Sequence, residues 1–283
     1  MSYKHKLPRE MDKDSFSKYI FPYLSKNKSG PEPKIGYYKT FSYILRVLHT
    51  GIQWNMLEID KTADGKKEIH YTTVFKKYSR WSNDGSLAKI FDNSIEQIIE
   101  NDLVDPNIIF GDGSINSAYL GGDDIGFSGH KHKKGNNIIL FSDVNSYALS
   151  FPYIMPANAS EVKNFKFGFK NISRHIKALY SKDFRGYCCA DGAFDSRSNR
   201  KHIFNSNMIP NIPENKRNRK QKKTGRMRLF CEKIQEMRDN SIERLFAWVD
   251  SYRRLKSRYE KKSTNFIGFN LIALALINLR KLV

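Results

Sequence analysis

The chain has 283 residues, 40% of them apolar, so it can bury a substantial core and is not disordered throughout. Its 49 lysines and arginines against 29 aspartates and glutamates leave a net charge of +20, which predicts a polyanionic partner, most commonly nucleic acid. The first ten residues lack an apolar signal core, and the longest apolar stretch, 266–279, is interrupted by Asn270 and Asn278 and is short for a membrane span. With three cysteines and no CxxC pair, these features favour a cytoplasmic protein that does not enter a membrane.

Apolar residues recur at helical spacing through residues 12–105, which predicts an all-helical first part. One helix is expected to end at Gly51, where a C-terminal cap belongs. The next is expected to begin with Thr72 as its N-cap. It presents a basic outer face, formed by Lys76, Lys77 and Arg80. Together these segments predict a small helical bundle.

At Pro106 the pattern changes to short apolar runs bounded by turn residues, which predicts a domain boundary near residue 105 and an α/β domain over 106–283. Strands are expected at residues 108–110, 138–141, 147–155, 186–190 and 209–212. Helices are expected at residues 162–180, 196–205, 229–260 and 264–283, the last of them buried.

Two segments of this second part are expected to be exposed. Residues 121–137 are rich in Gly, His and Lys and are predicted to form a solvated loop, in which His130 and His132 have no recognised metal-ligand spacing. Residues 214–228 contain eight basic residues and one acidic residue, which predicts a basic linker or arm.

Two of the expected strands lead directly into an Asp-Gly pair. Residues 108–113 read Ile-Ile-Phe-Gly-Asp-Gly, and residues 187–192 read Tyr-Cys-Cys-Ala-Asp-Gly. If the strands lie side by side, about 5 Å apart, the carboxylates of Asp112 and Asp191 can converge on one hard cation such as Mg²⁺. The alternative is that each Asp-Gly pair only closes a strand with a turn.

Glu243 lies at the margin of a predicted helix whose buried stripe includes Ile242, Phe246 and Val249, so its carboxylate can reach inward. The alternative is an ion pair with Arg238 or Arg244 on a solvated helix face, worth less than about 1 kcal/mol.

Several motifs resemble transposases of the insertion-sequence-five family, a bacterial IS4/IS5-like group of DDE transposases. Residues 22–100 resemble its N-terminal domain, with Gly-Ile-Gln-Trp-Asn-Met-Leu at 51–57 and Thr-Thr-Val-Phe-Lys-Lys-Tyr-Ser-Arg-Trp at 72–81. Three later stretches resemble its catalytic domain: residues 111–118, 187–196 and 242–248. The Arg-Arg pair at 253–254 and the Arg-Tyr pair at 258–259 belong to the same resemblance. The resemblance implies a ribonuclease-H-like mixed sheet flanked by helices, preceded by an all-α, helix-turn-helix-like domain.

The same resemblance implies a catalytic triad of Asp112, Asp191 and Glu243 that binds two Mg²⁺ ions, for which Mn²⁺ can substitute. Such a protein binds insertion-sequence terminal repeats, cuts the strand at the element's end and joins the freed 3′ hydroxyl to target DNA. The resemblance also implies a homodimer on DNA in the bacterial cytoplasm, associated with the nucleoid. Two alternatives remain: a nuclease that only hydrolyses, and a catalytically idle, transposase-derived DNA-binding protein.

Some relatives carry Tyr, Arg and Lys around the third acid, at positions that here hold Glu236, Asp239 and Asp250. Phosphate contacts near the triad must then come from other arginines, among them Arg238. The basic residues expected to contact DNA are Lys76, Lys77, Arg80, Lys131, Lys133, Lys134, Lys216, Arg217, Arg219, Lys220, Arg244, Arg253 and Arg254.

Overall fold

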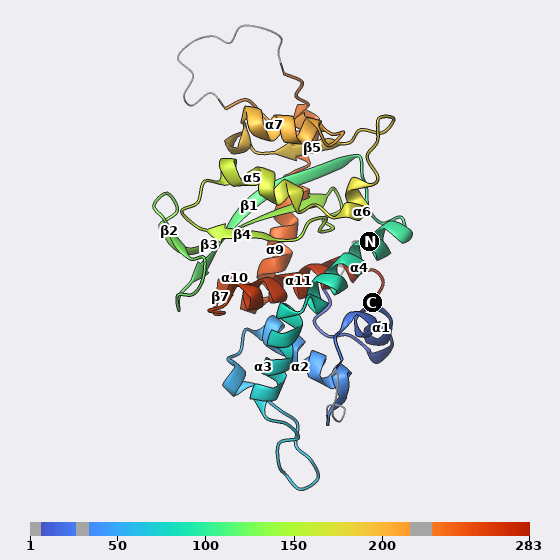
Figure 1. Ribbon diagram of the computed structural model, residues 1–283, viewed down its shortest axis with the longest axis vertical. Helices are drawn as coiled ribbons and strands as arrows, with labels where there is room; N and C mark the ends of the chain where they lie inside the picture. The colour runs from blue at the N-terminus through green and yellow to red at the C-terminus, as the bar shows by residue number, and fades with distance from the viewer. Residues whose placement is uncertain (1–6, 27–33, 216–227) are drawn as a thin grey trace.

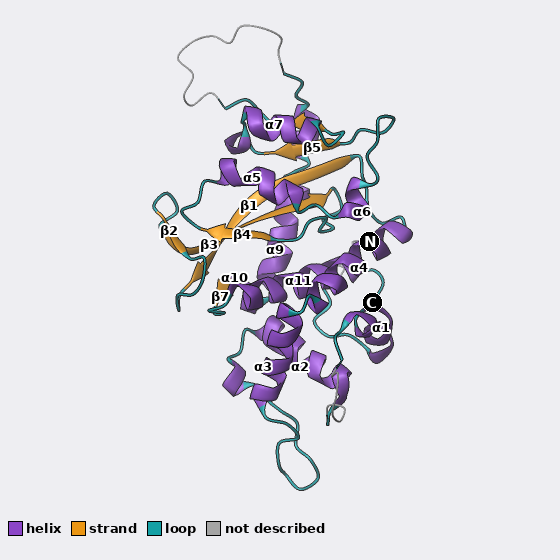
Figure 2. Ribbon diagram, in the orientation of Figure 1, coloured by secondary structure: helices purple, strands orange, loops and turns teal. Residues whose placement is uncertain are grey.

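The computed structural model describes residues 7–26, 34–215 and 228–283. The first part is helical, as expected (Figures 1 and 2). Its elements are α1 (Lys13–Tyr19), η1 (Phe21–Tyr23), α2 (Gly36–Thr50), η2 (Trp54–Met56), α3 (Tyr71–Asn83) and α4 (Ser86–Glu100).

The ends of α2 and α3 test two capping predictions. Gly51 follows α2 with a φ of 72°, a left-handed conformation that glycine adopts without strain. Thr72, however, is not the N-cap of α3. His70 has this role, because its ring nitrogen Nδ1 accepts a hydrogen bond from the backbone N–H of Thr72 at 3.4 Å, and the helix begins two residues earlier than an N-cap at Thr72 implies.

The second part contains one mixed sheet. Its strands are β1 (Ile108–Ala118), β2 (Gly126–Ser128), β3 (Lys133–Asp143), β4 (Tyr153–Pro156), β5 (Tyr187–Ala190), β6 (Ile209–Asn211) and β7 (Ser257–Arg258). Strand β3 is antiparallel to both β4 and β1, whereas β5 lies parallel to β1 and β6 lies parallel to β5. The short strands β2 and β7 extend the sheet along β3 and β1. Three antiparallel strands followed by two parallel ones form the ribonuclease-H-like arrangement β4-β3-β1-β5-β6.

Two strand predictions were too short. Strand β1 continues through Asp112 to Ala118, and β3 begins at Lys133, so much of the expected loop at 121–137 belongs to the sheet. The reason is their mutual pairing, which reaches Ser117 and Gly135 and satisfies the backbone groups of polar residues that have no strand pattern of their own. Asp112 therefore lies within a strand and not at its end.

The helices of the second part are shorter than predicted. They are α5 (Glu161–Lys170), α6 (Arg174–Lys177), α7 (Arg197–Phe204), α8 (Glu232–Glu236), η4 (Asp239–Glu243), α9 (Arg244–Ser251), α10 (Arg253–Lys256) and α11 (Ser263–Leu279). The expected helix at 162–180 breaks before Ser173, which caps α6. The expected helix at 229–260 breaks at Tyr252, whose backbone is extended between α9 and α10.

The C-terminal helix α11 joins the two parts, and Figure 1 shows it between the sheet and α2 and α3. The Tyr78 hydroxyl of α3 donates a hydrogen bond to the Asn265 carbonyl of α11. Farther along α11, the Asn278 amide accepts from the Ala148 backbone N–H at 2.8 Å and donates to its carbonyl at 3.0 Å. Residues of both parts consequently belong to one hydrophobic core. No helix in the described ranges is long and apolar enough to span a membrane.

Candidate active site

Asp112 and Asp191 are brought together by the parallel pairing of β1 and β5. The last paired residues are Gly111 and Ala190, and the two aspartates follow them directly. Adjacent strands lie about 5 Å apart. The two Asp-Gly segments therefore lie side by side, as predicted. Only β5 ends at this point, because β1 continues to Ala118. Asp112 is accessible because the neighbouring strand β5 ends at Ala190, and not because β1 ends.

The glycines around Asp112 allow the helix α5 to pack closely on one face of the sheet. A side chain at Gly111 would collide with the ring of Phe141, which in turn packs against Phe165 and Phe169 of α5. Successive strand residues point to opposite faces, so Asp112 points away from α5. The opposite face is the one on which Arg238, next to η4, meets Asp112.

Asp112 is an enclosed carboxylate with one cationic partner. Its side chain is 18% exposed and accepts a hydrogen bond from Nη2 of Arg238. Burial raises the pKa of Asp112. The guanidinium of Arg238 and the backbone N–H of Gly113 oppose this rise, whereas the negative charges of Glu161 and Asp191 add to it. An additional cation at this position would relieve the unfavourable burial of negative charge.

Glu243 is placed by a turn of π-helix, η4, which precedes α9. Its side chain is 53% exposed, and its Oε1 lies 3.5 Å from Nη1 of Arg238. The ion pair considered as an alternative role for Glu243 is thus present. It does not lie on a solvated helix face, however, because the Arg238 side chain is only 15% exposed and the same guanidinium binds Asp112.

No three His, Cys, Asp or Glu side chains in the described parts of the chain are grouped so that they could hold a metal ion. Arg238 provides a physical reason, because its guanidinium bridges Asp112 and Glu243. The donor chemistry is nevertheless suitable, since carboxylate oxygens are the ligands that Mg²⁺ takes.

Two polar residues near Asp112 were not found by sequence reasoning. Glu161 begins α5, and its carboxylate accepts a hydrogen bond from the side-chain amide of Asn137 on β3. A Cβ built on Gly113 would lie 3.5 Å from Cδ of Glu161 and 3.0 Å from Oδ1 of Asn137. Glu161 and Asn137 meet on the α5 side of the sheet, next to Gly113, only through the pairing of β1 with β3, which no local pattern reveals.

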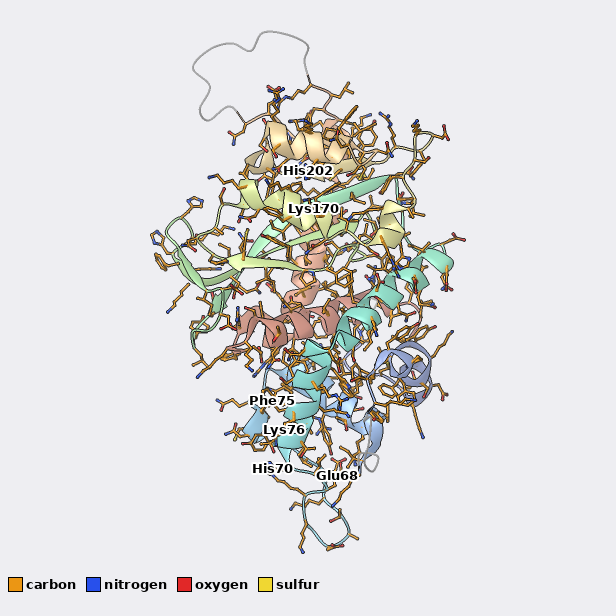
Figure 3. All side chains as sticks on the ribbon, viewed as in Figure 1. Glu68, His70, Phe75, Lys76, Lys170 and His202 are labelled. Atoms are coloured by element: carbon orange, nitrogen blue, oxygen red, sulfur yellow. The ribbon has the colours of Figure 1, made fainter. Side chains whose placement is uncertain are left out.

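The predicted DNA contacts on α3 differ in exposure. Lys76 is exposed, and Figure 3 shows it at the end of the molecule opposite His202 of α7. The guanidinium of Arg80 lies 3.8 Å from Asp84 and donates to the Lys26 carbonyl at 3.0 Å. Lys77 does not point freely outward as predicted, because its ammonium lies over the ring of Tyr37 at 4.8 Å. Its aliphatic chain and charge are used in packing.

Two of the predicted arginine contacts also have structural roles. Arg254 is 5% exposed, and its Nη2 lies 2.6 Å from Oε1 of Glu260, which is equally buried. Arg244 donates to the Ser146 hydroxyl at 2.8 Å and stacks over Trp248. Both arginines join elements of the fold, but only Arg254 is enclosed and thereby excluded as a DNA contact, whereas Arg244 is exposed and stays a predicted one.

The remaining predicted contacts are exposed or lie outside the described residues. Lys131, Lys133 and Lys134 are exposed between β2 and the start of β3, and Arg253 is exposed on α10. The other four, Lys216, Arg217, Arg219 and Lys220, fall outside the described residues.

The sheet and its two adjacent aspartates define an α/β protein of ribonuclease-H-like fold with an acidic centre. Residues 188–280 match a family model described as a transposase DDE domain. This stretch, roughly a third of the chain, includes Asp191 and Glu243 and extends through α11. The stretch is thus similar to a transposase DDE domain, and the finer insertion-sequence-five assignment has no separate match.

Two solved structures are similar at a low level: the Mos1 mariner paired-end complex with Mn, and a Mos1 transposase paired-end complex with the left transposon end. Their sequences are 12% and 13% identical to this chain, and both have a TM-score of 0.25. Each match covers 70% of this chain, which spans 64% of the length of the matched chains. Similarity this low carries no further argument. No curated protein matches the chain significantly.

Proposed function

We propose that this protein is a DNA transposase that binds insertion-sequence ends, cuts the strand at the element's end and joins it to target DNA. The observation that carries the proposal is the parallel pairing of β1 and β5, which makes Asp112 and Asp191 neighbours. The transposase DDE match over residues 188–280 supports the same chemistry.

Asp112, Asp191 and Glu243 are the residues proposed to hold two Mg²⁺ ions, for which Mn²⁺ can substitute. When bound, the ions would supply Lewis acidity to the attacking and leaving oxygens of phosphoryl transfer. The chain's contribution is to concentrate carboxylates in a partly enclosed position. Asp112 fits this role because its carboxylate is largely enclosed and burial raises its pKa, so a nearby cation stabilises its charged form.

Lysines on two separate elements are proposed to hold the DNA. Lys76 on α3 is exposed and is proposed to contact the terminal repeat, and the exposed lysines before and at the start of β3 are proposed to contact phosphates. The protein is proposed to act as a homodimer, because two element ends must be joined, and to be associated with the bacterial nucleoid in the cytoplasm.

The decisive experiment is cleavage of a labelled element end with Mg²⁺ or Mn²⁺. Asp112→Asn, Asp191→Asn and Glu243→Gln are each expected to abolish cleavage and retain DNA binding. Asp183→Asn is the matched control, because this acid is exposed and precedes the start of β5, whereas Asp191 follows its end. Wild-type cleavage by any of the three variants would remove that residue from the triad.

One observation favours a second candidate, a DNA-binding protein without catalytic activity. The guanidinium of Arg238 already forms an ion pair with the carboxylate of Asp112, which is a proposed metal ligand. Incubation with a supercoiled target distinguishes the possibilities. Joined products identify a transposase, nicking without joining identifies a nuclease that only hydrolyses, and selective DNA binding without any cleavage identifies the idle protein.

A further inference from the structure

Arg238 is the cation around which the candidate centre is assembled. It donates to Asp112 through Nη2 and lies 3.5 Å from Glu243 through Nη1, so it bridges β1 and the start of α9. Its Nε is buried and has no hydrogen-bond partner among the described residues. The guanidinium is thus held by its two carboxylate contacts and is not locked by a full set of hydrogen bonds.

The π-turn makes this bridge possible. Arg238 and Glu243 are five residues apart, and in an α-helix such residues point about 140° away from each other. The wider turn at Asp239–Glu243 brings them back to one side, where both meet the face of the sheet that carries Asp112.

The same two carboxylates are the ones that our proposed function assigns to the divalent ion. The guanidinium of Arg238 contacts Oδ2 of Asp112, so a divalent ion that binds Asp112 through this oxygen must displace it. The positive charge of Arg238 also opposes the binding of a second cation at the same carboxylate.

We propose that Arg238 is a positioning residue that holds Asp112 and Glu243 in a metal-free arrangement and competes with the divalent ion for Asp112. This inference rests on the proposed function, because it presupposes that Asp112 is a metal ligand. It explains why the described acids form no metal-binding group although their chemistry suits one.

The test is the affinity of the DNA-free protein for Mn²⁺, measured by titration calorimetry or by the spin-resonance signal of free Mn²⁺. Arg238→Gln is expected to bind Mn²⁺ roughly tenfold to a hundredfold more tightly than wild type, because a hydrogen bond to a charged group no longer has to be broken. Lys233→Gln removes one positive charge from the exposed face of nearby α8 and is expected to change the affinity less than about twofold.

Arg238→Lys is the second variant, in case the glutamine variant does not fold. Lysine keeps the charge but lacks the planar fork that bridges two carboxylates, so a smaller gain of several-fold is expected. Melting temperatures with and without Mn²⁺ give an independent measurement. Mn²⁺ is expected to raise the melting temperature of the Arg238 variants more than that of wild type.

The outcomes separate this inference from the proposed function. Unchanged or weaker Mn²⁺ binding by both Arg238 variants, with binding lost in Asp112→Asn, overturns the competition and leaves the metal site intact. An equal gain in Lys233→Gln also overturns it, because net charge alone would then explain the effect. If Asp112→Asn binds Mn²⁺ as wild type does, Asp112 is not a metal ligand, and the proposed function fails together with the inference.

Discussion

Replacing Arg254 with methionine is expected to destabilise the protein by about 3–5 kcal/mol, because one partner of a buried ion pair is then left without its counterion. Arg254 donates to Glu260 through both Nε at 2.7 Å and Nη2 at 2.6 Å. Its guanidinium also donates to the Ile52 carbonyl at 3.2 Å and lies over the rings of Tyr259 and Phe269. The side chain therefore connects α10 with the helical part of the molecule.

The cost of Arg254→Met is expected to depend on pH. Burial raises the pKa of Glu260 above its usual 4.5, and Arg254 opposes that shift. Without the arginine, the pKa of Glu260 rises further, so the folded state retains a proton that the unfolded chain has lost. The destabilisation is thus smallest below about pH 4.5 and grows as the pH rises through the folded-state pKa. Adding Glu260→Gln, which removes the unpaired charge, is expected to recover part of the stability at pH 7.

The assay is thermal or urea unfolding combined with DNA binding of the folded fraction. A loss of 3–5 kcal/mol corresponds to a melting temperature lower by roughly 6–20 °C. Arg253→Met is the matched control, because Arg253 precedes Arg254 in the chain but has an exposed side chain. This variant is expected to change the free energy of unfolding by less than about 0.5 kcal/mol and to weaken DNA binding. If Arg254→Met is as stable as Arg253→Met and loses DNA affinity, the structural role assigned to Arg254 is refuted.

Three further predictions concern a buried acid, a tight glycine and two lysines. Burial raises the pKa of Asp143 from 3.8 to about 6, so wild type loses about 3 kcal/mol of stability as the pH rises from about 4 to 6. Asp143→Asn is expected to remove that loss in urea unfolding, and parallel curves for the two proteins would contradict it. Gly111→Ala is expected to cost about 1–3 kcal/mol in the same assay, because the methyl group collides with the ring of Phe141, and an unchanged midpoint would show that α5 can yield. Lys76→Ala is expected to reduce the slope of log affinity against log salt by about 0.9, whereas Lys77→Ala has a smaller effect; equal slopes would place both lysines on DNA.

Local sequence patterns predicted the type of most elements because their causes are local. The helical part follows from apolar spacing, and the end of α2 follows from the left-handed conformation of Gly51. The alternation of strands and helices after residue 105 identified the α/β part. The burial of α11 followed from a composition that is apolar on all sides.

Element lengths failed where pairing partners are distant in sequence. The polar half of β1 and the start of β3 became strands because they pair with each other, from Ile109 with Asp143 to Ser117 with Gly135. The long helix expected before α11 was divided because Tyr252 adopts an extended backbone and β7 pairs with β1. Tertiary contacts outweighed local propensity in both cases.

For the acidic centre, the sequence by itself determined which carboxylates to consider. Asp112 and Asp191 share a local context, and their neighbourhood followed once β1 and β5 were paired in parallel. The prediction of Glu243 depended on the surrounding helix motif and on the family resemblance. Only the tertiary structure decided which cation meets these acids, because Arg238 reaches Asp112 across 126 residues through a π-turn that no periodicity predicts. Likewise, Arg254 and Lys77 looked like any other cations in the sequence until packing enclosed one with Glu260 and laid the other over Tyr37. The physical reason is that residue type and local backbone preference are properties of short segments, whereas burial and charge pairing depend on segments that meet only in the folded chain.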